Sequence, residues 1–518
     1  MREGIHIGSH LKTILKGAGI FILGTLISRI LTYITRIFIA RYFGSESYGL
    51  FNLGLAIVGF SIAFCLIGLP LGVQRYIAYY SARGENGIVK GILIFSLIVS
   101  GGISIIISGL IFILSDVIAK SAFNTPDFGF ALKIFAISIP FAALSQILFS
   151  AFIGFKKLKY MVYTERIASN LFKLIFIILF GIFGYGIVGL ALGNTLGLLV
   201  TFLLALYFLE NKIFSLKTKT GPIFLKKEII FFSLPLMLSS LMNSILARLD
   251  TLMLGYFRSA QEVGIYNAAI PTSQMLYIVT GSLGTLLLPV LTELYAKNQR
   301  EELRAVYKTV VKWAVYLNLP VFLIIALFSH QVLNIMFGSE YVDGYLALSI
   351  LSVGFFAGTF SFGASSLLTM DKKTHAIFLA SFISSVLNFI LNFLLIPTYG
   401  ITGAAIATSS SYLVYSAVLI IYSWRRIGIS PFSVPMLKSL PVGFLALAVV
   451  YTSSKIFFTY FNLYILTFLL ILFILLYAIL LLFFSGLQEE DIIVLKAIER
   501  KTGLKNDKIK TFIKKFIK

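Results

Sequence analysis

The chain has 518 residues, of which 58% are apolar and 12% are charged, and its mean hydropathy is +0.96. Soluble domains carry roughly 25% charged residues, and a water-soluble fold cannot bury so much apolar surface. The 49 Phe and 26 Tyr also exclude a disordered chain. A polytopic membrane protein remains. In such a protein a net charge of +22 is explained first by basic loops that set the membrane topology, and only then by a nucleic-acid partner.

Apolar windows of the length that crosses a bilayer, about 20 residues, recur along the whole chain. We therefore expect an all-α membrane protein with about 14 transmembrane helices. The expected spans are 17–41, 47–71, 89–114, 129–153, 164–183, 186–208, 229–254, 264–288, 309–329, 345–368, 375–396, 402–423, 438–459 and 462–484.

The Lys and Arg residues of the loops are distributed very unevenly between the two sides that these spans define. One side holds both chain ends and nearly all of the basic loop residues, whereas the other holds only Arg41, Lys120, Arg258 and Lys455. Because cytoplasmic loops carry the excess of Lys and Arg, we expect both termini in the cytoplasm and the protein in the cell membrane.

Several kinds of chemistry are not encoded by the sequence. Cys65 is the only cysteine, so an intrachain disulfide and a multi-cysteine zinc site are excluded. No Gly-x-x-x-x-Gly-Lys-Ser/Thr phosphate loop occurs, and no loop is long enough to form a catalytic domain. We expect no enzymatic activity and no cofactor, with Na⁺ or H⁺ as the candidate coupling ion.

The two halves of the sequence match each other. Tyr185–Ala191 resembles Tyr399–Ala405, and Tyr42-Phe43 resembles Tyr256-Phe257 at the same spacing of 214 residues. Gly49–Asn52 matches Gly264–Asn267 with one residue inserted. Six helices separate the copies, so the repeat is parallel, and folds of this type bind substrate between halves that rock against each other.

This repeat predicts two pseudo-symmetric six-helix lobes, at 12–209 and 226–423, followed by a helix pair at 437–484. Beyond that pair, residues 485–518 carry apolar residues on one helical face with lysines beside them. Such a pattern is typical of a basic amphipathic helix on the anionic cytoplasmic leaflet, although a solvated tail that only aids topology would have the same composition.

Two phrases at expected turns, Phe43–Gly49 and Ile396–Thr408, resemble those of the polysaccharide (O-antigen type) repeat-unit flippases. That family belongs to the superfamily of lipid II flippases and multidrug and toxin extrusion transporters. The resemblance implies a flippase that works by alternating access on a lipid-linked oligosaccharide. It also implies a cationic cavity, to which the first helix of the family contributes.

A few charged residues lie inside the expected spans, where a charge costs at least about 2.5–3.5 kcal/mol and marks a functional site by default. Besides the residues counted with the loops, they are the basic Arg29, Arg36, Lys133, Lys173 and Arg248 and the acidic Asp250. Arg29 and Arg36 share one helix face with Tyr33, and the repeat places Asn243 and Asp250 at the equivalent positions. We expect the first and seventh helices to line a common cavity.

We interpret these residues as a clamp for a polyprenyl phosphate or diphosphate, because guanidinium groups bind phosphate bidentately and stay charged. The expected head-group ligands are Arg29, Arg36, Arg248, Tyr33, Asn243 and Gln274. Asp250 is the candidate gating or coupling residue. The alternatives are a structural Arg36–Asp250 ion pair and lysines, Lys133 and Lys173, that reach the membrane interfaces.

The sequence thus predicts a flippase that moves polyprenyl-linked oligosaccharides to the outer leaflet for cell-surface polysaccharide or glycan assembly. Its partners would be this substrate, membrane lipids and, in the same process, glycosyltransferases or a polymerase, with no nucleic acid. The first alternative is a cation-coupled multidrug or small-molecule exporter, which Asp250 would suit. The second is a membrane glycosyltransferase or polymerase.

Overall fold

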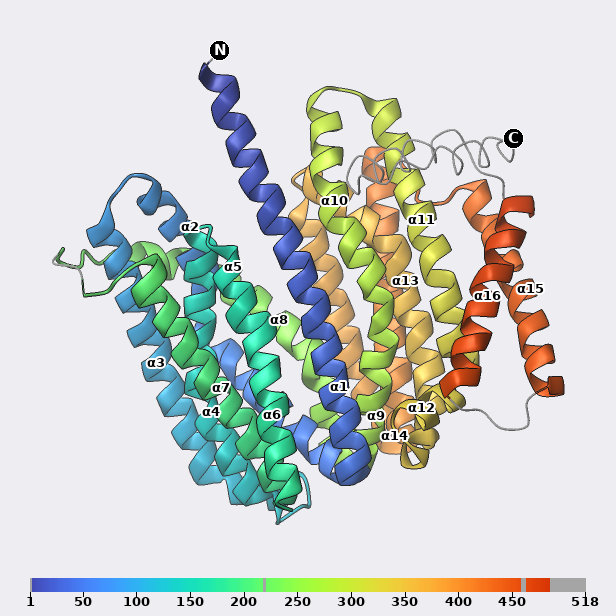
Figure 1. Ribbon diagram of the computed structural model, residues 1–518, viewed down its shortest axis with the longest axis horizontal. Helices are drawn as coiled ribbons and strands as arrows, with labels where there is room; N and C mark the ends of the chain where they lie inside the picture. Colours follow the sequence, from blue (N-terminus) through green and yellow to red (C-terminus); the bar gives the residue numbers. More distant parts are fainter. Residues whose placement is uncertain (1, 218–219, 458–462, 485–518) are drawn as a thin grey trace. The chain divides into compact units, whose positions relative to one another are not determined.

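The computed structural model describes residues 2–217, 220–457 and 463–484, and every regular element in them is helical (Figure 1). By its contacts the chain divides into two compact units, Met1–Asn267 and Ala268–Lys518. The expected tail at 485–518 lies outside the described residues, and the expected lobe boundaries stay predictions.

The first unit contains nine α-helices and three short π-helical segments among its described residues. Its elements are α1 (Arg2–Leu66), α2 (Leu69–Ala82), α3 (Asn86–Val117), η1 (Ile118–Ala122), α4 (Phe128–Gly154), α5 (Leu158–Met161), η2 (Val162–Ala168), α6 (Ser169–Ile182), α7 (Gly186–Phe208), η3 (Leu209–Ile213), α8 (Lys226–Phe257) and most of α9 (Ala260–Ser273).

The second unit begins within α9 and continues with a 3-10 turn. Its further elements are η4 (Gln274–Leu276), α10 (Tyr277–Ala296), α11 (Arg300–Leu327), α12 (Ser329–Met336), η5 (Ser339–Gly344), α13 (Tyr345–Met370), α14 (Thr374–Ile427), α15 (Val434–Phe457) and α16 (Leu463–Phe484).

Nine helical stretches of the described chain are long and apolar enough to cross a membrane, and a shorter apolar helix covers Thr467–Leu481. The nine are Leu23–Leu66, Asn86–Ala122, Phe128–Gly154, Gly186–Ile213, Ala260–Ala296, Arg300–Leu327, Ser339–Met370, Thr374–Ile427 and Val434–Ser454. The protein is therefore a multi-pass, all-helical membrane protein.

The expected boundaries are observed at two glycines and fail at one further point. The expected boundaries at Gly44 (φ 80°) and Gly400 (φ 53°) are present as non-helical kinks, each of which separates two helical segments within α1 and within α14. The expected span 47–71 is interrupted, because Ile67 and Gly68 adopt positive φ values and Pro70 then starts α2. Proline suits the first turn of a helix, where its missing N–H costs no hydrogen bond.

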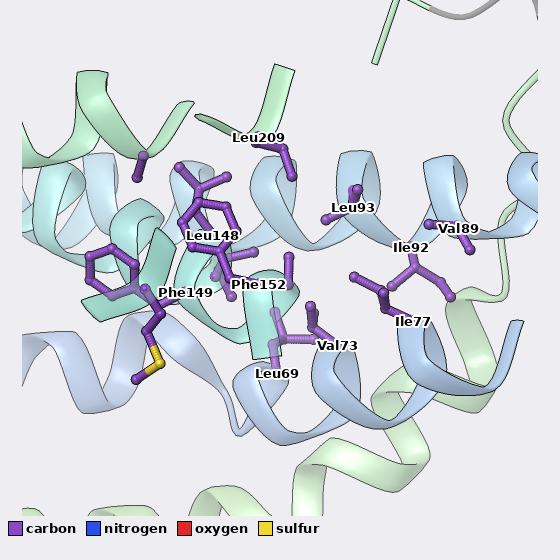
Figure 2. Close-up of a cluster of buried hydrophobic side chains, with 14 of the residues drawn as sticks. Leu69, Val73, Ile77, Val89, Ile92, Leu93, Leu148, Phe149, Phe152 and Leu209 are labelled. Atoms are coloured by element: carbon purple, nitrogen blue, oxygen red, sulfur yellow. The ribbon is translucent and has the colours of Figure 1, made fainter. Parts of the chain in front are cut away.

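A large apolar core holds the first unit together. It contains buried side chains of α2, α3, α4 and the α7–η3 end, with Ile229 of α8 packed against them. Figure 2 shows Leu69, Val73 and Ile77 of α2 beside Leu93 of α3 and Phe152 of α4. The long helix α1 contacts α3 and α4 of this core and also α6, α7 and α8.

The matched segments of the repeat meet each other inside the first unit. A Cβ atom built on Gly49 would lie 1.7 Å from the carbonyl oxygen of Ala260. A Cβ atom on Gly264 would lie 2.0 Å from the carbonyl oxygen of Ser45. Ser45 and Gly49 are the repeat equivalents of Ala260 and Gly264, so the two contacts are reciprocal, as a local twofold relationship requires.

Candidate functional site

Arg36 lies in the first segment of α1, before the Gly44 kink, and is partly buried. Its Nη1 atom is 3.4 Å from the hydroxyl of Tyr48, to which it donates. Tyr48 is fully buried and in turn donates to the carbonyl oxygen of Asn267 in α9, at 3.1 Å. The chain Arg36–Tyr48–Asn267 therefore joins the kinked helix α1 to α9.

Arg248 lies in α8, which packs along α1 (Figure 1). Its Nη1 atom donates a hydrogen bond of 3.0 Å to the carbonyl oxygen of Leu55 in the second segment of α1. Arg36 and Lys173 each lie close enough to Arg248 for an electrostatic interaction with it. Basic side chains from α1, α6 and α8 thus gather in one region of the first unit.

These three basic groups, Arg36, Lys173 and Arg248, form the cationic cluster. Within the described part of the chain, none of them forms an ion pair with a carboxylate. Like charges at short range repel each other, and the repulsion grows as water is excluded. Such a cluster is favourable only when an anion or water balances it, and guanidinium groups match phosphate oxygens geometrically.

Arg29 lies seven residues before Arg36 on α1 and is exposed. It makes no ion pair or hydrogen bond with any residue that the structure describes. The neighbouring face of α1 is fixed to α6, because Asn170 donates to Ser28 at 3.0 Å and Thr32 donates to Asn170 at 3.1 Å. Tyr33, four residues after Arg29, is partly buried.

Asp250 points away from the region that Arg248 occupies, as two residues of separation on a helix require. It is 5% exposed and accepts a hydrogen bond of 2.9 Å from the hydroxyl of Tyr266 in α9. Nearby, Asn267 and Thr251 also hydrogen-bond to each other. The carboxylate therefore lies among buried polar groups and, within the described residues, does not pair with Arg36.

Two further predicted ligands are less well placed by the structure. Asn243 belongs to α8, but its side chain lies outside the described residues. Gln274 is exposed and opens the 3-10 turn η4 of the second unit. Roles for both in binding stay predictions.

Lys173 lies in α6 and is partly buried. Its stem packs on α7, where a Cβ atom on Gly197 would lie 2.5 Å from its Cγ atom. Lys133 behaves differently, because it pairs with Asp116 at 2.6 Å. No acidic residue occurs between Arg166 and the end of α6, whereas Lys133 follows an acidic loop.

Several amides inside the helices bond to other helices. Asn318 of α11 donates to Thr359 of α13 at 3.0 Å and to the carbonyl oxygen of Leu276 at 3.1 Å. Asn388 donates to Thr408 at 3.3 Å, joining the two segments of α14. Such contacts contribute about 0.6–2 kcal/mol each, so they stabilise the bundle.

The fold is that of a known class of membrane transporters. The chain superposes on the lipid II flippase MurJ in its inward closed conformation with a TM-score of 0.69. The match covers 88% of this chain and 97% of that protein at 17% identity, which relates the folds alone. An inward-facing multidrug resistance transporter of the MATE family shares the fold, with a TM-score of 0.65 at 18% identity.

The chain belongs to the family of polysaccharide biosynthesis proteins, whose pattern it matches over residues 14–295. Residues 235–394 also match the MatE family. This membership confirms the predicted family, and it agrees with the expectation of a transporter, not an enzyme.

Two relatives extend the likeness over most of the sequence. An uncharacterized membrane protein, MJ1068 of Methanocaldococcus jannaschii, is 26% identical over 422 residues, which cover 78% of this chain and 83% of the relative. The putative O-antigen transporter of Shigella flexneri is 25% identical over 412 residues, covering 75% of this chain and 92% of the relative.

Proposed function

We propose that the protein flips a polyprenyl phosphate- or diphosphate-linked oligosaccharide from the cytoplasmic to the outer leaflet, for cell-surface polysaccharide or glycan assembly. The observation that carries this proposal is the cationic cluster, since three basic groups inside a membrane protein call for an anionic ligand. The name of the Shigella relative, an O-antigen transporter, is consistent with a glycan as the cargo.

In this proposal the anionic junction between lipid and sugar binds to Arg36 and Arg248, and Lys173 adds to the local positive charge. Arg29, about two turns before Arg36, would meet the head group as it enters, because its side chain is exposed. Tyr33, Asn243 and Gln274 would bind sugar or phosphate oxygens. The polyprenyl tail would remain in the bilayer.

The proposed topology has fourteen crossings in two six-helix lobes and a terminal pair. The lengths of α1 and α14, with kinks at Gly44 and Gly400, support two crossings each. Further crossings, in addition to the nine long apolar stretches, would be formed by the α5–α6 stretch, α8 and α16. Both termini would then be cytoplasmic in the cell membrane, with glycosyltransferases or a polymerase acting before and after transport.

One observation favours a second candidate, a cation-coupled exporter of small molecules. Asp250 is a buried carboxylate with polar neighbours, a setting in which a proton or Na⁺ can be bound and released. Within the flippase proposal the same residue would couple transport to Na⁺ or H⁺. Dye efflux that depends on an ion gradient and disappears in Asp250→Asn alone would favour the exporter.

The proposal is tested in cells whose surface polysaccharide depends on this protein. Arg29→Ala and Arg248→Ala should each abolish export while the protein still inserts at normal levels. Arg300→Ala, at an exposed position at the start of α11, is the matched control and should export normally. Full export by both of the first two variants would contradict the cationic clamp.

A further inference from the structure

Arg248 lies directly over a glycine of α1. A Cβ atom built on Gly59 would be 2.0 Å from the Cζ atom of Arg248, 2.3 Å from Nε and 2.4 Å from Nη2. Contacts this short with three guanidinium atoms mean that the group occupies the space that any side chain at position 59 would take. The absence of a Cβ atom at Gly59 therefore creates the room for this cation.

The same turn of α1 also supplies a hydrogen-bond acceptor. Leu55 lies four residues before Gly59, and its carbonyl oxygen accepts from Nη1 of Arg248 at 3.0 Å. A carbonyl oxygen has two lone pairs, so it can accept this bond in addition to its helical one. A guanidinium group has five N–H donors, so this bond leaves others for a ligand.

A flexible arginine would not stay in this position without such contacts. Arg36 and Lys173 repel it electrostatically, and its side chain has many rotamers to which it could move. The gap at Gly59 and the carbonyl of Leu55 together hold the guanidinium beside two other cations before any anion is bound. Preorganisation of this kind raises affinity because less ordering remains to be done on binding.

The arrangement is not a consequence of the internal repeat. At the spacings that relate the two halves, Gly59 corresponds to Gln274 and Arg248 corresponds to Ile34. The repeat-related pair of positions, 34 and 274, therefore has neither the glycine nor the cation. The glycine–arginine pair occurs at only one of the two repeat-related places, so the packing that both copies share does not require it. This asymmetry points to a functional role.

We propose that Gly59 is a positioning residue for the anion site: it orients the guanidinium of Arg248 for bidentate binding of a phosphate group. This inference rests on the proposed function. It predicts that a single methyl group at position 59 moves the cation and lowers affinity for phosphate, although the residue itself touches no substrate. Because the clash is with the end of a flexible side chain, the fold tolerates the substitution.

The test measures binding of farnesyl diphosphate to the purified full chain, with farnesol as the uncharged comparison. Gly59→Ala should weaken binding of the diphosphate about tenfold, which corresponds to ~1.4 kcal/mol, and should leave farnesol binding unchanged. Gly102→Ala, at a glycine of α3 with open space around it, is the matched control. In an Arg248→Ala background, Gly59→Ala should cause no further loss.

The outcomes separate the two proposals. Wild-type affinity in Gly59→Ala, or an equal additional loss in the Arg248→Ala background, would overturn the positioning role and leave the clamp intact. Wild-type affinity in Arg248→Ala would overturn both. If Gly59→Ala lowers the yield of folded protein, adding Arg248→Ala should restore it, and failure to restore it would show that the clash is elsewhere.

Discussion

Gly49 and Gly264 pack against each other at equivalent positions of the internal repeat, each facing a backbone carbonyl of the opposite segment. The helices approach so closely there that neither position has room for a Cβ atom. The same segments share a second equivalence, because Asn52 donates to the carbonyl oxygen of Tyr48 and Asn267 to that of Val263.

Because the two helices approach so closely, we expect neither Gly49 nor Gly264 to tolerate a larger side chain. Gly49→Ala and Gly264→Ala should each lower the thermal stability of the detergent-purified protein, by about 1–3 kcal/mol or more, because the clashes are with backbone atoms. Gly102→Ala serves as control, since its surroundings are open. Unchanged unfolding temperatures in both crossing variants would mean that the segments lie farther apart.

Tyr48 connects Arg36 to this crossing, so its hydroxyl should matter for both stability and binding. Tyr48→Phe keeps the ring and removes the donor to Asn267, which should cost about 0.5–1.5 kcal/mol of stability. It should also weaken farnesyl diphosphate binding, because Arg36 loses the acceptor that orients it. Calorimetric unfolding and a binding titration on the same sample measure the two effects; a stability loss with unaltered binding would separate Tyr48 from the site.

Lys173 and Lys133 provide a matched pair of lysines inside the helices. Lys173→Met should weaken diphosphate binding and reduce its dependence on salt, because one positive charge of the cationic cluster is lost. Lys133→Met should change neither, since Lys133 is paired with Asp116. Equal effects of the two substitutions would contradict the assignment of Lys173 to the cluster.

Asp250 should affect coupling more than binding. Asp250→Asn removes the charge and keeps an oxygen that can accept the hydrogen bond from Tyr266. We expect diphosphate binding to persist while the dependence of transport on a Na⁺ or H⁺ gradient disappears. Transport by reconstituted protein under each gradient measures this effect, and an unaltered dependence on both ions would exclude Asp250 as the coupling residue.

Much of the architecture could be predicted from the sequence, because long apolar stretches and glycines determine locally where helices run and where they break. The two glycines expected at turns, Gly44 and Gly400, are the sites of the kinks. The break at Ile67 and Gly68 was missed, because the apolar window runs through it and only Pro70 marks a new helix start.

The sequence indicated candidate residues for the site, but it did not indicate which residues they contact. Arg36 and Arg248 stand out in the sequence because charge inside an apolar span is costly. Their partners, Tyr48 and the carbonyl of Leu55, depend on which helices pack together, and no local pattern encodes that. The role of Gly59 likewise depends on the packing of Arg248 in α8 against it, which the sequence alone does not indicate.

The most direct test of the flippase account is a transport assay with purified protein in liposomes. A fluorescent polyprenyl diphosphate-linked disaccharide is incorporated, and a membrane-impermeant quencher reports how much of it reaches the outer leaflet. Wild-type protein should equilibrate the lipid between leaflets, whereas Arg248→Ala protein, inserted equally well, should not. Equal movement in both, or no movement above protein-free liposomes, would contradict the flippase account.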